Sequence, residues 1–137
     1  IPALIGYCIG LVGAFLGGFA YGKPTELPWG VTYQIQNVKY TVPVHPIQIY
    51  AIIAVTLLLL SKKRLKDKTE FFNREGNTTI YLSTGFSLIY FLLEFLKGDD
   101  TLLIQGIRIP MIIAAMVFIT SGIALAYRYK SFKNEST

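Results

Sequence analysis

The sequence is poor in the residues that build metal sites and disulfides. Its 137 residues include one histidine, His45, and one cysteine, Cys8. Because these two lie on different segments, they cannot supply the ligands of a zinc site, and one cysteine cannot form an intramolecular disulfide. No glycine-rich phosphate-binding loop is present either. We therefore expect neither a metal nor another cofactor.

Charged residues are also scarce. They make up 15% of the chain against about 25% in average soluble domains, while 53% of the residues are hydrophobic and the mean hydropathy is +0.48. A helix needs about 20 apolar residues to cross a bilayer, and four stretches approach this length. A soluble protein that buried all four would keep too little polar surface. The sequence thus predicts an all-α integral membrane protein of one domain, with about four transmembrane helices near 1–22, 46–61, 79–97 and 109–127.

Positive charge is distributed unevenly over the predicted loops. Loop 62–78 and tail 128–137 together carry nine lysines and arginines. The other ends of the spans carry four, which are Lys23, Lys39, Lys97 and Arg108. Because basic residues favour the cytoplasmic side, we predict that loop 62–78 and the C-terminus are cytoplasmic and that loops 23–45 and 98–108 face outward. This topology, with attraction to anionic lipid, accounts for the net charge of +5, so no nucleic-acid partner is expected.

The first outer loop, 23–45, is the most unusual connection. Its stretch "VTYQIQNVKYTV" alternates and is rich in β-branched residues, so a small irregular or β-containing loop with a short strand or hairpin is predicted. Pro46 then suits the first turn of the next helix, where its missing N–H costs nothing. At the end of the third span, Gly98 is predicted to cap the helix C-terminus.

Polar side chains are predicted to meet at the outer ends of the spans. They are His45, Gln48, Tyr50, Glu94 and Lys97, with Asp99 and Asp100 nearby. An ionisable residue inside a span points to function, because burying it without a partner is costly. Two other interpretations stay open: Glu94 forms a structural ion pair with Lys97 or Arg108, and His45 is a helix-start residue satisfied by its own loop.

Three motifs in order carry a resemblance to a known family. They are "YGKPTELPWGV", "HPIQIYA" and "FLLEFLKGDD". Together they resemble the C-terminal half of the prolipoprotein diacylglyceryl transferases, in which a His-Pro-x-Gln-Leu-Tyr-Glu motif opens one helix and a Phe-x-x-Glu-Phe-x-Arg-x-x-Asp motif ends the next. The resemblance covers nearly all of the chain. Family members are considerably longer, so it implies an upstream part with further spans.

The resemblance implies a reaction, its substrates and its site. The family transfers a diacylglyceryl group from phosphatidylglycerol to a lipobox cysteine thiol, at the outer face of the bacterial cytoplasmic (inner) membrane. It implies catalytic roles for His45 and Glu94, and substrate binding by Gln48, Tyr50, Tyr21 and Lys97. The implied partners are phosphatidylglycerol and a lipobox-containing prolipoprotein. Another membrane subunit would be a partner if the chain serves instead as an inactive subunit of a membrane complex.

The sequence also departs from the family motifs. In the stretch before "YGKP", where the family has Arg, Asn, Asn and Glu, this chain has Leu11, Ala14, Gly17 and Phe19. Ala51 replaces the final Glu of the histidine motif, and Tyr90 and Lys97 replace two arginines around Glu94. Two functions therefore stay open: a diacylglyceryl transferase, or a catalytically inactive transferase-like subunit that binds lipid or serves as a scaffold in a membrane complex.

Overall fold

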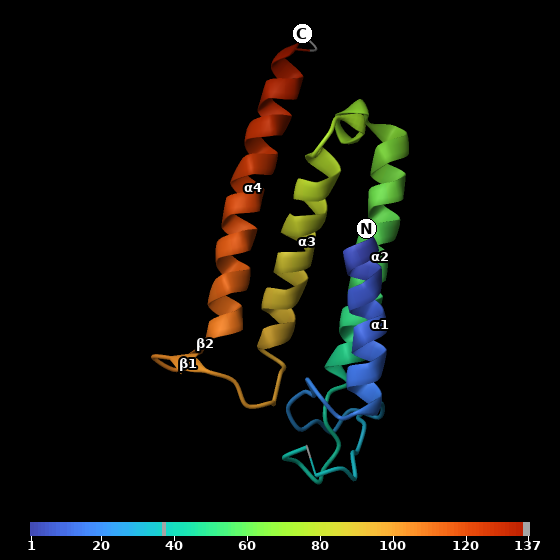
Figure 1. Ribbon diagram of the computed structural model, residues 1–137, viewed down its shortest axis with the longest axis vertical. Helices are drawn as coiled ribbons and strands as arrows, with labels where there is room; N and C mark the ends of the chain where they lie inside the picture. The colour runs from blue at the N-terminus through green and yellow to red at the C-terminus, as the bar shows by residue number, and fades with distance from the viewer. Residues whose placement is uncertain (37, 136–137) are drawn as a thin grey trace.

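The computed structural model describes residues 1–36 and 38–135, most of which are helical. Four helices run along the molecule: α1 (Pro2–Leu16), α2 (Ile47–Lys68), α3 (Asn77–Glu94) and α4 (Ile109–Glu135). A 3₁₀ helix, η1 (Glu70–Asn73), joins α2 to α3, and the strands β1 (Leu103–Ile104) and β2 (Ile107–Arg108) precede α4 (Figure 1). The prediction of a mostly helical protein is confirmed.

Helix α1 ends earlier than the apolar stretch that contains it. The stretch 1–22 is helical only to Leu16, because Gly18 (φ +65°) and Ala20 (φ 54°) adopt left-handed backbone conformations. The Phe19 N–H donates to the carbonyl oxygen of Ala14 at 2.8 Å, which closes the helix end as in a Schellman motif. The chain therefore leaves the helix before it reaches the "YGKP" motif.

Helices α2 and α4 extend beyond their apolar parts. Helix α2 begins at Ile47 with Pro46 as its N-cap, in agreement with the sequence prediction, and continues to Lys68. The first part of the predicted loop 62–78 is therefore helical. Lys66 and Lys68 lie in its last turn, where the helix dipole favours cations. Helix α4 likewise continues through most of the predicted tail.

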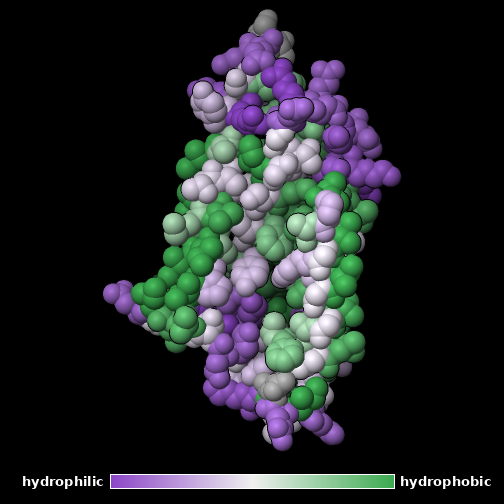
Figure 2. Space-filling model, viewed as in Figure 1, coloured by the Kyte–Doolittle hydropathy of each residue, from purple (hydrophilic) through white to green (hydrophobic). Residues whose placement is uncertain are grey.

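The helices pack in chain order, α1 on α2, α2 on α3 and α3 on α4. The core between them is small. Val55 and Leu58 of α2 and Leu82 of α3 are buried, and Leu58 occupies the space that a Cβ at Gly85 would need. Many large hydrophobic side chains are exposed instead, including Ile123 of α4, which is 66% exposed. Figure 2 shows this hydrophobic surface along α4 and hydrophilic residues gathered near the C-terminus.

One helix within residues 1–36 and 38–135, α4, is long and apolar enough by length and composition to cross a membrane. Only 6% of its apolar window is buried inside the molecule, so it is not the core helix of a soluble protein. Helix α1 is apolar but has 15 residues. The structure thus contains one candidate span, and the four predicted spans remain a prediction.

The loops differ from the prediction in where the strands lie. Val31 and Pro24 each form a single bridge to Val44, and the described part of 31–42 contains no strand pair; Asn37 lies outside the described residues. The antiparallel pair is β1 with β2, joined by Gln105 (φ 50°) and Gly106 (φ 81°). Two successive positive φ angles match a type I′ hairpin turn. Gln-Gly forms this turn here in place of the more usual Asn-Gly.

Candidate functional site

The long loop after α1, the start of α2, the end of α3 and the β1–β2 hairpin all lie at one end of the molecule (Figure 1). A backbone junction ties them together. The Gly22 N–H donates to the His45 carbonyl, and the His45 N–H donates to the Lys23 carbonyl, each at 3.0 Å. On the other side, Lys23 N–H donates to Leu96 O at 2.8 Å and Gly98 N–H to Tyr21 O at 3.0 Å. Segment 21–23 is therefore held between the ends of α2 and α3.

Two glycines make this junction possible. A Cβ at position 22 would lie 2.5 Å from the His45 Cβ and 2.6 Å from the His45 carbonyl oxygen. A Cβ at position 98 would lie 2.5 Å from the Gly22 carbonyl oxygen. Real Cβ atoms do not approach that closely, so only glycine allows the three backbones to meet. Gly98, predicted as a helix cap, instead serves this close approach, and the C-cap of α3 is Phe95.

His45 belongs to a small aromatic cluster, the His45 cluster, with Tyr50 and Trp29. Its Nδ1 lies 3.3 Å from the Tyr50 hydroxyl, which also accepts a 2.7 Å hydrogen bond from Trp29 Nε1. The rings of His45 and Tyr50 meet edge to face at 6.0 Å. Because the Tyr50 oxygen has two lone pairs, it can accept from both Trp29 Nε1–H and His45 Nδ1–H. That arrangement leaves the lone pair of the imidazole on Nε2.

Glu94 holds together a second cluster, of four charged residues. Its Oε2 pairs with Lys97 Nζ at 2.9 Å, and its Oε1 accepts from Arg108 Nε at 2.7 Å. Arg108 Nη2 in turn donates to Asp99 Oδ1 at 2.7 Å. Burial opposes the charged form of Arg108, but the hydrogen bonds that it donates to Glu94 and Asp99 outweigh this and raise the pKa of the guanidinium. Two positive and two negative groups make this Glu94 cluster neutral. The sequence left open whether Glu94 forms a structural ion pair with Lys97 or Arg108, and in the structure it pairs with both.

A cavity of about 150 Å³ lies among the helices, beside Lys97 of the Glu94 cluster. Its lining comes from α1, α2, α3 and the junction: Tyr7, Leu11, Ala20, Ile47, Gln48, Ala51, Tyr90, Leu93 and Lys97. Gln48 is fully buried, and its Nε2 donates to the Phe19 carbonyl at 2.6 Å. Its Oε1 has no hydrogen-bond partner within residues 1–36 and 38–135. Lys97 Nζ reaches the Tyr90 hydroxyl at 3.2 Å from the same side.

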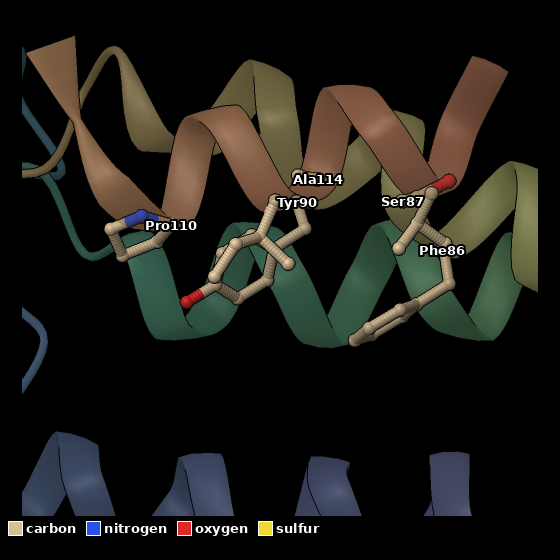
Figure 3. Close-up of a pocket in the computed structure, with 7 residues that line it drawn as sticks. Phe86, Ser87, Tyr90, Pro110 and Ala114 are labelled. Carbon is tan, nitrogen blue, oxygen red and sulfur yellow. The ribbon is translucent and has the colours of Figure 1, made fainter. Parts of the chain in front are cut away.

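An apolar pocket of about 300 Å³ lies on the other side of Tyr90, between α3 and α4. Figure 3 shows Phe86, Ser87 and Tyr90 from α3 with Pro110 and Ala114 from α4. Ile113 and Val117 complete the lining. Tyr90 is thus shared, because its side chain borders both the polar cavity and the apolar pocket.

The comparisons with known proteins show the family to which the chain belongs. The family model for prolipoprotein diacylglyceryl transferase matches residues 1–127. The chain belongs to the prolipoprotein diacylglyceryl transferase family. It is 31% identical over 131 residues to the phosphatidylglycerol–prolipoprotein diacylglyceryl transferase of Finegoldia magna, covering 95% of this chain and 49% of the relative. It is 29% identical to that of Polynucleobacter necessarius, covering 92% of this chain and 47% of the relative. The chain therefore spans about half the length of these curated relatives. No solved structure matches it significantly.

Four of the seven positions at which the chain departs from the transferase motifs line the cavity. They are Leu11, Ala51, Tyr90 and Lys97. The carbonyl of Phe19, a further departure, accepts the Gln48 hydrogen bond. At these four positions the family motifs have arginines and a glutamate. In this chain the cavity is lined there by a leucine, an alanine, a tyrosine and one lysine.

The structure sorts the predicted site residues into separate groups. Gln48 and Lys97 line the cavity, while His45 and Tyr50 form their own cluster, and no hydrogen bond or ion pair among the described residues joins His45 to Glu94. The Tyr21 hydroxyl accepts from the Lys39 N–H at 3.1 Å and thus braces the long loop. Their roles with substrate stay predictions.

Sequence reasoning missed two tyrosines near the site. Tyr7 lines the cavity from α1, and the buried Tyr33 hydroxyl has no hydrogen-bond partner of good geometry among the described residues. Burial raises the pKa of Tyr33, and the nearby Gln48 side chain acts against this rise. The sequence feature that could have pointed to Tyr7 is its phenol hydroxyl within the otherwise apolar run "IPALIGYCIG".

Proposed function

We propose that this chain forms the part of a membrane diacylglyceryl transferase that holds phosphatidylglycerol beside a lipobox cysteine thiol. The observation that supports it is a polar cavity and an apolar pocket that meet at Tyr90. A diacylglyceryl lipid has the same two parts, a polar headgroup and acyl chains. The headgroup enters the cavity beside Gln48, and an acyl chain lies in the pocket between α3 and α4. Membership of the family supports diacylglyceryl transfer as the proposed reaction.

In this proposal all four helices span a bacterial inner membrane, with the site at the outer face and the C-terminus in the cytoplasm. At 1.5 Å per residue, α3 measures about 27 Å and α4 about 40 Å, against a hydrocarbon core of about 30 Å. Helix α1 measures about 22 Å, so residues 17–22 complete its crossing at the outer interface. The basic residues of loop 62–78 and the end of α4 then lie on the cytoplasmic side.

His45 serves as the base in the proposed reaction. The thiol loses its proton to His45 Nε2, the sulfur attacks the glyceryl carbon that bears the phosphate ester, and a C–S bond forms as that C–O bond breaks. The electron pair of the broken bond leaves with glycerol phosphate. The proposal requires the tautomer in which His45 Nδ1–H donates to the Tyr50 oxygen; Trp29 Nε1 donates to the same oxygen, which supports its role as the acceptor.

Glu94 supports the cavity indirectly, through the cations that it holds. Both of its oxygens are committed to cations, which favours a role in positioning Lys97 and Arg108 over proton transfer. Lys97, held by Glu94, forms the polar wall of the cavity together with the Tyr90 hydroxyl. Gln48 and Tyr21 belong to the substrate-binding side, Gln48 by direct contact and Tyr21 by bracing the loop.

The alternative function is an inactive transferase-like subunit that binds lipid or scaffolds a complex. One observation favours it: Lys97, the one cation among the described residues that line the cavity, is already neutralised by Glu94. A leaving phosphate is best stabilised by positive charge that is not already paired. A partner subunit would then have to provide it.

A transfer assay distinguishes the two. The purified chain in liposomes receives labelled phosphatidylglycerol and a lipobox peptide. If the chain is a transferase, lipidated peptide forms, and the rate of its formation falls about 100-fold or more in His45→Ala. The rate also falls in Glu94→Ala. It stays at the wild-type level in Asp100→Ala, where the side chain is exposed. A wild-type chain that yields no product while phospholipid co-purifies with it would establish the inactive subunit.

A further inference from the structure

We infer that α2 binds a phospholipid of net negative charge in the cytoplasmic leaflet, with an acyl chain beside Leu57 and Leu60 and the phosphate between Arg64 and Lys68. This lipid is not a substrate. The end of α2 lies at the opposite end of the molecule from the long loop and the β1–β2 hairpin (Figure 1). The inference rests on the proposed topology and adds a lipid site that is separate from the proposed reaction.

The site is a groove of about 470 Å³ along the second half of α2. Leu57, Ser61, Arg64 and Lys68 line it at steps of three or four residues, so they share one face of the helix. Tyr81 of α3 also belongs to the lining. Leu57 marks the apolar end of this face and Lys68 its charged end. The groove therefore changes along its length from apolar to positively charged, as an anionic lipid changes from acyl chain to phosphate.

The groove also has the depth of one membrane leaflet. From Ile47, the first residue of α2, to Arg64 the helix rises about 26 Å, against about 30 Å of hydrocarbon. From Leu57 to Lys68 it rises about 16 Å, close to half of that hydrocarbon thickness. In the proposed topology Leu57 thus lies near the middle of the bilayer. Arg64 and Lys68 lie at its cytoplasmic edge, where long basic side chains reach the headgroups.

Arg64 and Lys68 have no counter-ion in the described protein. Within residues 1–36 and 38–135, neither side chain forms an ion pair or a hydrogen bond, and no acidic residue lines the groove. Arg74, at the same end of the molecule, is by contrast paired with Glu135 at 2.6 Å. A phosphate supplies the missing negative charge, and a guanidinium can hold two of its oxygens. The ammonium group of a zwitterionic headgroup would be repelled by the same two cations.

The hydroxyls in the groove are satisfied within the protein. Ser61 Oγ–H donates to the Leu58 carbonyl at 2.7 Å. Because a serine hydroxyl has one hydrogen, Tyr81 is then the donor in its 2.8 Å hydrogen bond with Ser61 Oγ. The section of the groove before the two cations therefore presents no unsatisfied donor, and an acyl chain can cover it without stranding a polar group.

Photocrosslinking in liposomes tests this site without any thiol substrate. The liposomes consist of phosphatidylcholine with a small share of one photoreactive lipid, either phosphatidylserine or phosphatidylcholine, which carries a diazirine midway along an acyl chain. Mass mapping of the labelled peptides locates the contact. We expect labelling at Leu57 and Leu60 to be about tenfold higher with the serine lipid, a preference that two cations at a membrane surface can supply. Equal labelling by the two lipids would overturn the inference.

Two double variants with the same change of net charge separate the groove from general attraction to a basic surface. Arg64→Gln with Lys68→Gln removes both groove cations and should lower the preference to about twofold or less. Lys63→Gln with Lys66→Gln removes two cations of the same helix that do not line the groove, and should leave the preference near its wild-type value. All four side chains are exposed, so neither variant threatens the fold. Similar losses in both variants, or no loss in the first, would overturn the inference.

The crosslinking and transfer experiments fail independently. A chain that lipidates the peptide but is labelled equally by the two lipids has the proposed activity and lacks this site. A chain that gives no product but is labelled selectively at Leu57 and Leu60 lacks the activity and keeps the site. If α2 does not span the membrane, neither photoreactive lipid labels these leucines, and the topology fails together with the inference.

Discussion

Gly22 and His45 approach so closely that a methyl group at position 22 would lie 2.5 Å from the His45 Cβ. The contact joins the start of the long loop after α1 to its end, two residues before α2. It also places Gly22 beside the residues that follow α3, since the neighbouring Lys23 N–H donates to Leu96 O. The positions of His45 and of the Glu94 cluster therefore depend on one glycine.

We expect Gly22→Ala to destabilise the chain by about 1–3 kcal/mol, because the added methyl must displace the backbone of His45. Thermal unfolding in detergent measures the change. Gly10→Ala is the control, since a Cβ at position 10 meets nothing within 4 Å and the substitution replaces a glycine inside a helix. It should be neutral or stabilising by up to about 1 kcal/mol. Equal melting temperatures for the two variants would show that the junction tolerates a side chain.

Tyr50→Phe should change the state of the imidazole. The substitution removes the oxygen that His45 Nδ1 and Trp29 Nε1 share, so the neutral ring is no longer held in one tautomer. Because His45 is the only histidine, its ¹⁵N NMR signals are unambiguous. We expect one tautomer to dominate in the wild type and a mixture in Tyr50→Phe, with slower transfer wherever activity is present. Unchanged nitrogen shifts would exclude a role for Tyr50 in orienting the ring.

Glu94→Gln should be among the most destabilising single substitutions at the site. It leaves Lys97 and Arg108 close together without the carboxylate that pairs with both. Removing one member of a buried ion pair typically costs about 3–5 kcal/mol. Asp100→Asn breaks an exposed pair with Lys39 and should cost less than about 1 kcal/mol. Denaturant titration of both variants makes the comparison, and similar losses would contradict the assignment of Glu94 as the centre of the cluster.

Acid should loosen the end of α4. A hydrogen bond from Arg74 lowers the pKa of Glu135 below its usual 4.5 and ties the α4 terminus to the turn before α3. Because the folded pKa is depressed, this stabilisation is present above the unfolded pKa and is lost as the pH falls through the folded one. Hydrogen exchange in the last turn of α4 should therefore rise below about pH 4.5 relative to its intrinsic rate. In Glu135→Gln the relative exchange should already be high and should not change with pH.

Parts of this structure follow from local sequence, and parts do not. The helices follow from their apolar runs, and the Glu94–Lys97 pair follows from its i,i+3 spacing. The partner of Gln48 does not, because the Phe19 carbonyl lies 29 residues earlier and is aimed by an irregular backbone. Gly98 was misread because a helix cap and a close backbone approach both call for glycine.

The strand prediction failed for a similar reason. Alternation in "VTYQIQNVKYTV" favours a strand locally, but a strand also needs a partner, and the described residues of this loop (23–36 and 38–45) form only single bridges at Val44. The short stretch Leu103–Arg108 does find one in its own hairpin. Sequence patterns indicate which segments can pair, whereas tertiary contacts decide which of them do.

The junction at Gly22 also has a consequence for biosynthesis. Its members, Gly22, His45 and Gly98, are separated by more than half the chain, and the Glu94 cluster further requires Arg108. A growing chain therefore contains both Gly22 and Glu94 before the site can be complete, and until residue 108 is synthesised Glu94 lacks Arg108 as a counter-ion. A chain truncated before the hairpin would leave the buried Glu94 carboxylate without this partner.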